Sequence, residues 1–205
     1  MGGFFGIASK RDALADVFFG TDYHSHLGTR RAGVAAYDEK IGLQRVIHNI
    51  ESTPFRTKFD HILEEMHGNS AIGCICDSDH QPVLIRSRLG TYALCFIGTV
   101  NNANKLIDLC LESGHEHFDA MTGGAVNTTE LLAALINQKS DLIEGIRFAQ
   151  ESIEGSASIL MLCNDGSLIV ARDKLGRTPI HIGKSEDGYS VSFESFAFEK
   201  LGYVD

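Results

Sequence analysis

The side chains most suited to covalent chemistry lie together near the middle of the chain. Cys74 and Cys76 form a C-x-C pair, and Asp77, Asp79 and His80 follow directly. A thiol with a neighbouring carboxylate and imidazole could act as a nucleophile that cleaves an amide. The carboxylates argue against this role, because nearby negative charge raises the pKa of a thiol and keeps it protonated. The pattern favours a buried structural thiol on a strand.

The residues that could bind a metal ion or a phosphate group form weaker patterns than this cysteine cluster. His24 with His26 and His115 with His117 are close pairs, but neither has a third ligand nearby in sequence, and the C-x-C has no second cysteine pair at zinc spacing. The sequence also contains no phosphate-binding glycine loop, no G-x-S-x-G elbow and no H-E-x-x-H helix. We therefore expect no bound metal and no cofactor.

Short apolar runs predict the strands that must position these residues, and periodic segments predict the helices between them. The first helix is expected to have Ser9 as its N-cap and to end at Gly20. Because the helices are grouped between blocks of strands, an α+β fold with layered sheets is favoured over a doubly wound parallel sheet. The predicted strands cover residues 3–8, 33–37, 45–48, 71–76, 83–85, 92–97, 158–163, 167–171, 180–183 and 189–193, and the other helices cover residues 54–63, 102–112, 128–137 and 142–153.

Length and composition limit the classes of function. The 205 residues are 43% hydrophobic and 22% charged, which predicts one globular domain over residues 1–205. The formal net charge is -9, and the basic residues are scattered, so we expect no nucleic-acid partner. No apolar run reaches the roughly 20 residues that a membrane span requires, and the N-terminus lacks the pattern of a signal peptide. With five cysteines in mostly apolar runs, we expect a cytoplasmic protein without a membrane partner. The sequence leaves open whether the protein forms a homo-oligomer.

Four segments, taken in order, share a pattern with one enzyme family. They are residues 1–7 (MGGFFGI), 25–33 (SHLGTRRAG), 171–179 (ARDKLGRTP) and 192–197 (SFESFA). They resemble the M-C-G-I-F-G-I, H-R-G-Q-[DE]-S-A-G, V-R-D-P-L-G-I-R-P and A-S-E-[TS]-C-A segments of class II glutamine amidotransferase domains. Within this class they look most like the amidophosphoribosyltransferase branch of purine biosynthesis. The resemblance implies a four-layer αββα sandwich of N-terminal nucleophile hydrolase type.

The resemblance also implies a nucleophile, and this chain lacks it. In the family, removal of the initiator methionine exposes a cysteine whose thiol attacks glutamine and whose free amine acts as the general base. Gly2 stands at that position. A glycine has no side chain that can attack a carbonyl carbon, so the route through a thioester is closed.

The substrate-binding positions that the resemblance implies are replaced as well. Cys76 stands where the family has the arginine that binds the substrate carboxylate, and Asp77 beside it would repel that carboxylate. Ile97 replaces the asparagine of the oxyanion hole, whereas Gly98 keeps its backbone N–H. Thr128 replaces the aspartate that binds the substrate amine. Together with the nucleophile position, these residues form the predicted degenerate glutamine pocket: Gly2, Cys76, Asp77, Ile97, Gly98 and Thr128.

We therefore expect a degenerate glutaminase domain that does not hydrolyse glutamine. It would serve as a scaffold or regulatory module for a synthase or phosphoribosyltransferase domain, in the same or another chain, with residues 1–205 as the N-terminal part of a longer protein. Two alternatives stay open. One is an active amide hydrolase with Cys76 as a relocated nucleophile, assisted by Asp77, Asp79 or His80. The other is a small-molecule sensor in which the former glutamine pocket takes an uncharged or cationic ligand.

Overall fold

The protein is a sandwich of two antiparallel sheets. The structure is a computed structural model that describes residues 2–119, 121 and 124–205. The first sheet has six strands in the order β3-β2-β4-β1-β10-β9, and the second has four in the order β5-β6-β7-β8. The strands are β1 Gly2–Ser9, β2 Arg31–Asp38, β3 Gly42–Asn49, β4 Ser70–Cys76, β5 Val83–Ser87, β6 Gly90–Val100, β7 Gly155–Cys163, β8 Leu168–Ala171, β9 His181–Lys184 and β10 Gly188–Ser192.

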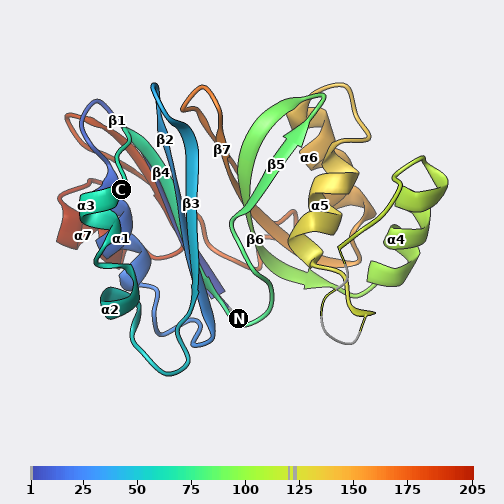
Figure 1. The fold of residues 1–205 in the computed structure, drawn as a ribbon, viewed down its shortest axis with the longest axis horizontal. Coiled ribbons are helices and arrows are strands. Elements are labelled where there is room, and N and C mark those ends of the chain that lie inside the picture. The colour runs from blue at the N-terminus through green and yellow to red at the C-terminus, as the bar shows by residue number, and fades with distance from the viewer. Residues whose placement is uncertain (1, 120, 122–123) are drawn as a thin grey trace.

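Helices cover the outer face of each sheet, as Figure 1 shows, and the four layers confirm the predicted αββα sandwich. Three apolar clusters fill the spaces between the layers, one under each helical layer and one between the two sheets. The helices on the six-stranded sheet are α1 Leu14–Asp22, α2 Phe55–Phe59, α3 Ile62–Glu65 and α7 Phe196–Leu201, and those on the four-stranded sheet are α4 Ala103–Glu112, α5 Thr128–Ile136 and α6 Leu142–Ser152. None of the helices within the described residues is long and apolar enough to span a membrane.

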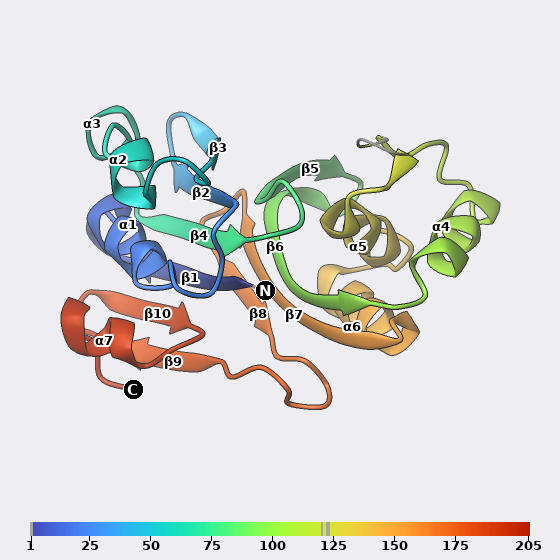
Figure 2. The same ribbon diagram turned by 90° about the horizontal axis from the view of Figure 1, so that it is seen from below.

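Strand β1 lies at the centre of the six-stranded sheet, between β4 and β10. Its side chains alternate between two cores: Phe5 packs under the helices, whereas Phe4 packs between the sheets. Gly2 is two residues from Phe4, and it therefore shares the face that is directed at the second sheet. In register, Gly2 pairs with Cys76 at the end of β4. Figure 2 shows this end of β1 beside the point where the chain leaves β4 toward the second sheet.

Two predicted helix boundaries are wrong. Ser9 is the last residue of β1, and the N-cap of α1 is Ala13, which makes no side-chain capping bond. Gly20 does not end α1, which continues to Asp22. The glycine is needed there for close packing, because a Cβ atom at this position would lie 2.4 Å from Cγ of Phe5.

Two other helical predictions differ from the structure. The segment predicted as one helix from residue 54 to 63 forms two short helices, α2 and α3, and Leu63 is 38% exposed. Helix α7 was not predicted, because its six residues are too few for a periodic pattern to be recognised.

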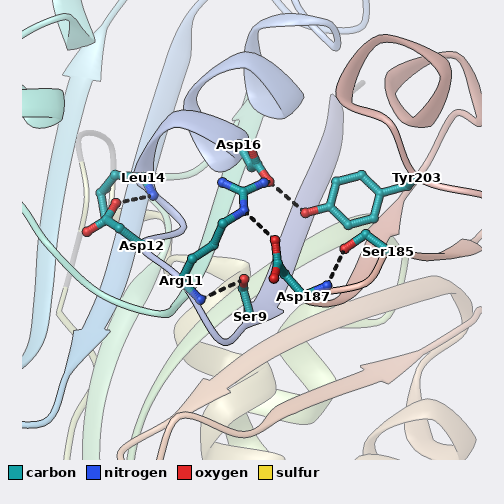
Figure 3. A network of polar contacts seen from close by, with 8 residues as sticks. All are labelled: Ser9, Arg11, Asp12, Leu14, Asp16, Ser185, Asp187 and Tyr203. Atoms are coloured by element: carbon teal, nitrogen blue, oxygen red, sulfur yellow. Dashed lines mark hydrogen bonds and ion pairs between the residues drawn. The ribbon is translucent and has the colours of Figure 1, made fainter.

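A polar network joins the start of α1 to the C-terminal residues (Figure 3). The buried carboxylate of Asp16 accepts hydrogen bonds from Arg11 Nη2 at 2.7 Å and from the Tyr203 hydroxyl at 2.6 Å. Arg11 Nε also donates to Asp187, in the turn between β9 and β10, at 3.0 Å. Charge-assisted bonds of this kind are roughly twice as strong as neutral ones, so the network fixes the chain end against α1.

Candidate functional site

Position 2 has no room for a side chain. A Cβ atom on Gly2 would lie 2.5 Å from the carbonyl oxygen of Ile75, 2.8 Å from Cδ1 of Ile97 and 3.2 Å from Cα of Cys76. The first of these atoms belongs to the neighbouring strand β4 and cannot rotate away. The site implied for the nucleophile is therefore closed by backbone on one side and by the Ile97 side chain on the other.

A small cavity lies beside this position, between the end of β4, the last residues of β6 and the start of α5. Its volume is about 130 Å³. It contains four of the six residues predicted for the degenerate pocket, which come from segments more than 20 residues apart in sequence. The lining residues are Cys76, Ser78, Phe96, Ile97, Gly98, Val100 and Thr128.

The residues that follow β4 form a strap beside the cavity, which we define as residues 77–82, and its Ser78 is one of the lining residues. Asp79 is 4% exposed, and its carboxylate accepts hydrogen bonds from the backbone N–H of Thr128 at 3.2 Å and from the Thr128 hydroxyl. The Asn127 amide donates to the carbonyl oxygen of His80 at 3.0 Å. The start of α5 thus fixes the strap in place.

A buried glutamine holds the strap from its other end. The side-chain oxygen of Gln81 accepts from the backbone N–H of Phe96 at 2.7 Å, and its side-chain nitrogen donates to the carbonyl oxygen of Phe96 at 2.9 Å. Gln81 is 1% exposed. This paired bond resembles the pairing between two strands, and it fixes the strap to β6.

The Cys76 thiol lacks the features of an activated nucleophile. Burial raises the pKa of its thiol to about 12, with the neighbouring Cys74 acting in the same direction. The thiol donates to the carbonyl oxygen of Asp79 at 3.1 Å. The imidazole of His80 accepts a hydrogen bond from Arg31 and so is not available as a base on that nitrogen. These contacts give the relocated-nucleophile alternative no structural support.

The Asp77 side chain contacts a different part of the protein from the other predicted pocket residues. Its carboxylate accepts from the backbone N–H of Thr29 at 2.7 Å, and this bond lowers the pKa of Asp77. The bond joins the end of β4 to the loop that precedes β2. Asp77 is not among the residues that line the cavity.

The second and fourth motif segments lie in contact with each other, and the third forms a loop that is held by its own side chains. His26 of the second segment and Glu194 of the fourth form an ion pair with 3.0 Å between Nε2 and Oε2. His24 is buried, and its Nε2 lies 3.2 Å from the Ser192 hydroxyl. In the third segment, the Asp173 carboxylate accepts from the backbone of Arg177 and so closes its own loop.

Sequence reasoning did not find several residues of the site. Val100 has a detectable signal, because it is two residues beyond Gly98 on β6 and therefore on the same face. Phe96, two residues before Gly98, has the same signal, whereas Ser78 and Gln81 have none, since their positions depend on how the strap crosses to β6. Among the residues that the structure describes, no three His, Cys, Asp or Glu side chains are grouped as metal ligands.

A family model described as a glutamine amidotransferase domain matches residues 67–199, which is more than half of the chain. The chain belongs to the glutamine amidotransferase family. The domain is 29% identical to the amidophosphoribosyltransferase of Methanocaldococcus jannaschii, over 98% of this chain and 44% of the relative. It is also 29% identical to the amidophosphoribosyltransferase of Archaeoglobus fulgidus, over 86% of this chain and 39% of the relative.

Solved structures agree with this assignment. The amidotransferase domain superposes on the glutamine phosphoribosylpyrophosphate amidotransferase from B. subtilis, complexed with ADP and GMP, with a TM-score of 0.83 and 27% identity over 98% of this chain and 44% of that chain. A class-II domain protein from Silicibacter pomeroyi, with a TM-score of 0.60 and 14% identity over 93% of this chain and 87% of that one, shares the fold. The domain spans less than half the length of the curated relatives it matches.

Proposed function

We propose that this glutamine amidotransferase domain does not hydrolyse glutamine and that it acts as a scaffold or regulatory module for a phosphoribosyltransferase or other synthase domain. The observation that carries the proposal is position 2, where Gly2 offers no nucleophile and where a Cβ atom would meet the carbonyl oxygen of Ile75 at 2.5 Å. The other predicted lesions, at Cys76, Ile97 and Thr128, line the adjoining cavity.

The size of the cavity supports the proposal. A cavity of about 150 Å³ holds a molecule the size of benzene, and glutamine has roughly four more non-hydrogen atoms than benzene. The cavity here measures about 130 Å³. Glutamine would enter only if the walls of the cavity moved apart, and a movement of the strap would break the bonds of Asp79 to Thr128 and of Gln81 to Phe96.

The chemistry of the cavity supports it as well. An oxyanion hole needs two donors, and Ile97 contributes none from its side chain; loss of one such donor typically raises the barrier by about 2.7–4 kcal/mol. Without a cation at position 76, the substrate carboxylate would have no bidentate partner there. Binding and catalysis are thus both impaired, independently of the missing thiol.

The proposed partner follows from the relatives. They are named amidophosphoribosyltransferases, and one similar solved structure is described as the allosteric regulatory enzyme of purine biosynthesis. More than half of each relative lies outside the match. We infer that this domain works beside a phosphoribosyltransferase domain, in the same or another chain, in purine biosynthesis. Native purification of the endogenous protein followed by mass spectrometry tests this, and a protein found without such a domain would contradict it.

Incubation with glutamine tests the loss of activity. We expect glutamate release at the rate of a heat-denatured sample, measured beside the B. subtilis amidotransferase as an active control. Release that saturates with glutamine and scales with the protein concentration would refute the proposal.

A further inference from the structure

The cavity beside Gly2 remains open although glutamine does not fit it. Its volume of about 130 Å³ suits a ligand of roughly six non-hydrogen atoms or fewer. Its walls combine apolar side chains, namely Phe96, Ile97 and Val100, with the hydroxyl-bearing Ser78 and Thr128. A ligand that fills it needs a short alkyl part and one polar group.

Two side-chain hydrogen-bond donors at the cavity are already engaged. The Thr128 hydroxyl donates its proton to the Asp79 carboxylate, and the Cys76 thiol donates its proton to the Asp79 carbonyl oxygen. What Thr128 can offer a ligand is therefore the lone pairs of its oxygen. Ser78 can accept as well as donate. The polar wall of the cavity is thus suited to a ligand that donates.

The N–H groups at the start of α5 are engaged as well and do not form an anion site. Its first three N–H groups are those of Thr128, Thr129 and Glu130. The first donates to Asp79, and the other two donate to the Asn127 side chain at 2.8 and 3.3 Å. A helix N-terminus binds an anion through such free N–H groups, and here the chain's own side chains occupy them.

A negative charge adjoins the polar wall. Asp79 is buried and bonded directly to Thr128, and no residue that lines the cavity is basic. Cys76 stands where the family has an arginine, so the site lacks that cation, and Asp79 provides a carboxylate beside Thr128. A carboxylate in a low-dielectric setting favours a cation close to it.

We propose that this cavity binds a small aliphatic primary amine in its ammonium form, with the alkyl chain against Ile97 and Val100 and the ammonium group on Thr128 and Ser78. The inference rests on the proposed function, because it assumes a pocket that no longer processes glutamine. It assigns the retained pocket a ligand class: small organic cations.

Amide NMR spectra of the complete chain test the proposal with three probes of similar size and different charge: n-propylammonium, propionate and n-propanol. We expect only n-propylammonium to shift the backbone amides of Gly98 and Thr128 in a saturable manner. Equal shifts from propionate, or shifts that map outside the cavity, would overturn the proposal.

Two variants locate the binding. Asp79→Asn removes the charge behind Thr128 and should weaken binding about tenfold to a hundredfold. Its matched control is Asp108→Asn on the exposed surface of α4, which changes the net charge equally and should leave affinity unchanged. Because Asp79→Asn could loosen the strap, Val100→Phe provides a second test, since it fills the cavity while the Asp79 bonds stay in place. Full affinity in Val100→Phe would overturn the site.

The same samples separate this inference from the proposed function. Glutamate release is measured before the amine is added. Release at the background rate together with absent amine shifts would refute the amine site alone, whereas saturable release would refute the proposed function.

Discussion

Restoring the missing nucleophile should destabilise this protein without activating it. In Gly2→Cys, the new Cβ atom would lie 2.5 Å from the carbonyl oxygen of Ile75 and 2.8 Å from Cδ1 of Ile97. Overpacking of a tight site typically costs about 1–3 kcal/mol. In a chain of this length, each kcal/mol lowers Tm by roughly 2–4 °C. We therefore expect a Tm about 2–12 °C below that of the wild type.

Two further variants separate the causes. Gly2→Ala adds the Cβ atom without the thiol, so it should show most of the same loss of Tm. Ile97→Val removes the Cδ1 atom, and Gly2→Ala should cost less in that background, which a double-mutant cycle measures as coupling. The cost should not vanish, because the Ile75 carbonyl oxygen stays in place.

The assays are thermal unfolding by circular dichroism and glutamate release. A Gly2→Cys variant with the Tm of the wild type would show that position 2 has room for a side chain. A variant that also hydrolyses glutamine would show that Cys76, Ile97 and Thr128 are not lesions, and the account of the pocket would be wrong.

Three other predictions concern thiol reactivity, pH and the C-terminal network. Native Cys76 should react with iodoacetamide far more slowly than the denatured chain at pH 7.5, because its pKa is raised to about 12; rapid native labelling, mapped by mass spectrometry, would contradict this. Burial lowers the pKa of His24. Near pH 6.5 this imidazole therefore binds a proton in the unfolded chain but not in the folded protein. The free energy of unfolding, measured in urea, should therefore fall as the pH drops below about 6.5, and His24→Gln should reduce that slope by up to roughly 1.4 kcal/mol per pH unit; an unchanged slope would count against it. Tyr203→Phe removes the bond to buried Asp16 and should cost about 1.5–3 kcal/mol in the same assay, whereas the control Tyr189→Phe, at an exposed ring, should cost less than about 0.5 kcal/mol.

The layers of the fold could be predicted because their signals are local. Asp165-Gly166 and Asp187-Gly188 mark turns whose flanking runs became β7–β8 and β9–β10. Helix boundaries are harder to predict from the sequence, because tertiary packing sets them. Gly20 looks like a helix end in sequence, but it lies within α1 because the ring of Phe5 packs on it.

The pocket could be predicted only in part, because its closure depends on contacts between distant residues. The family pattern predicts Cys76, Ile97 and Thr128 as pocket residues, and the structure brings them to one cavity. The bond between Asp79 and Thr128 joins residues 49 positions apart, and no local pattern in the sequence encodes it. The strap therefore emerges only from the three-dimensional arrangement.

The most direct test of the account is a glutamine titration followed through the backbone amides of Gly98 and Thr128. If the cavity is too small for glutamine, neither amide should shift in a saturable manner up to millimolar glutamine. A saturable shift at both amides, together with loss of the Asp79 contact to Thr128, would show that the pocket opens for glutamine and would contradict the account.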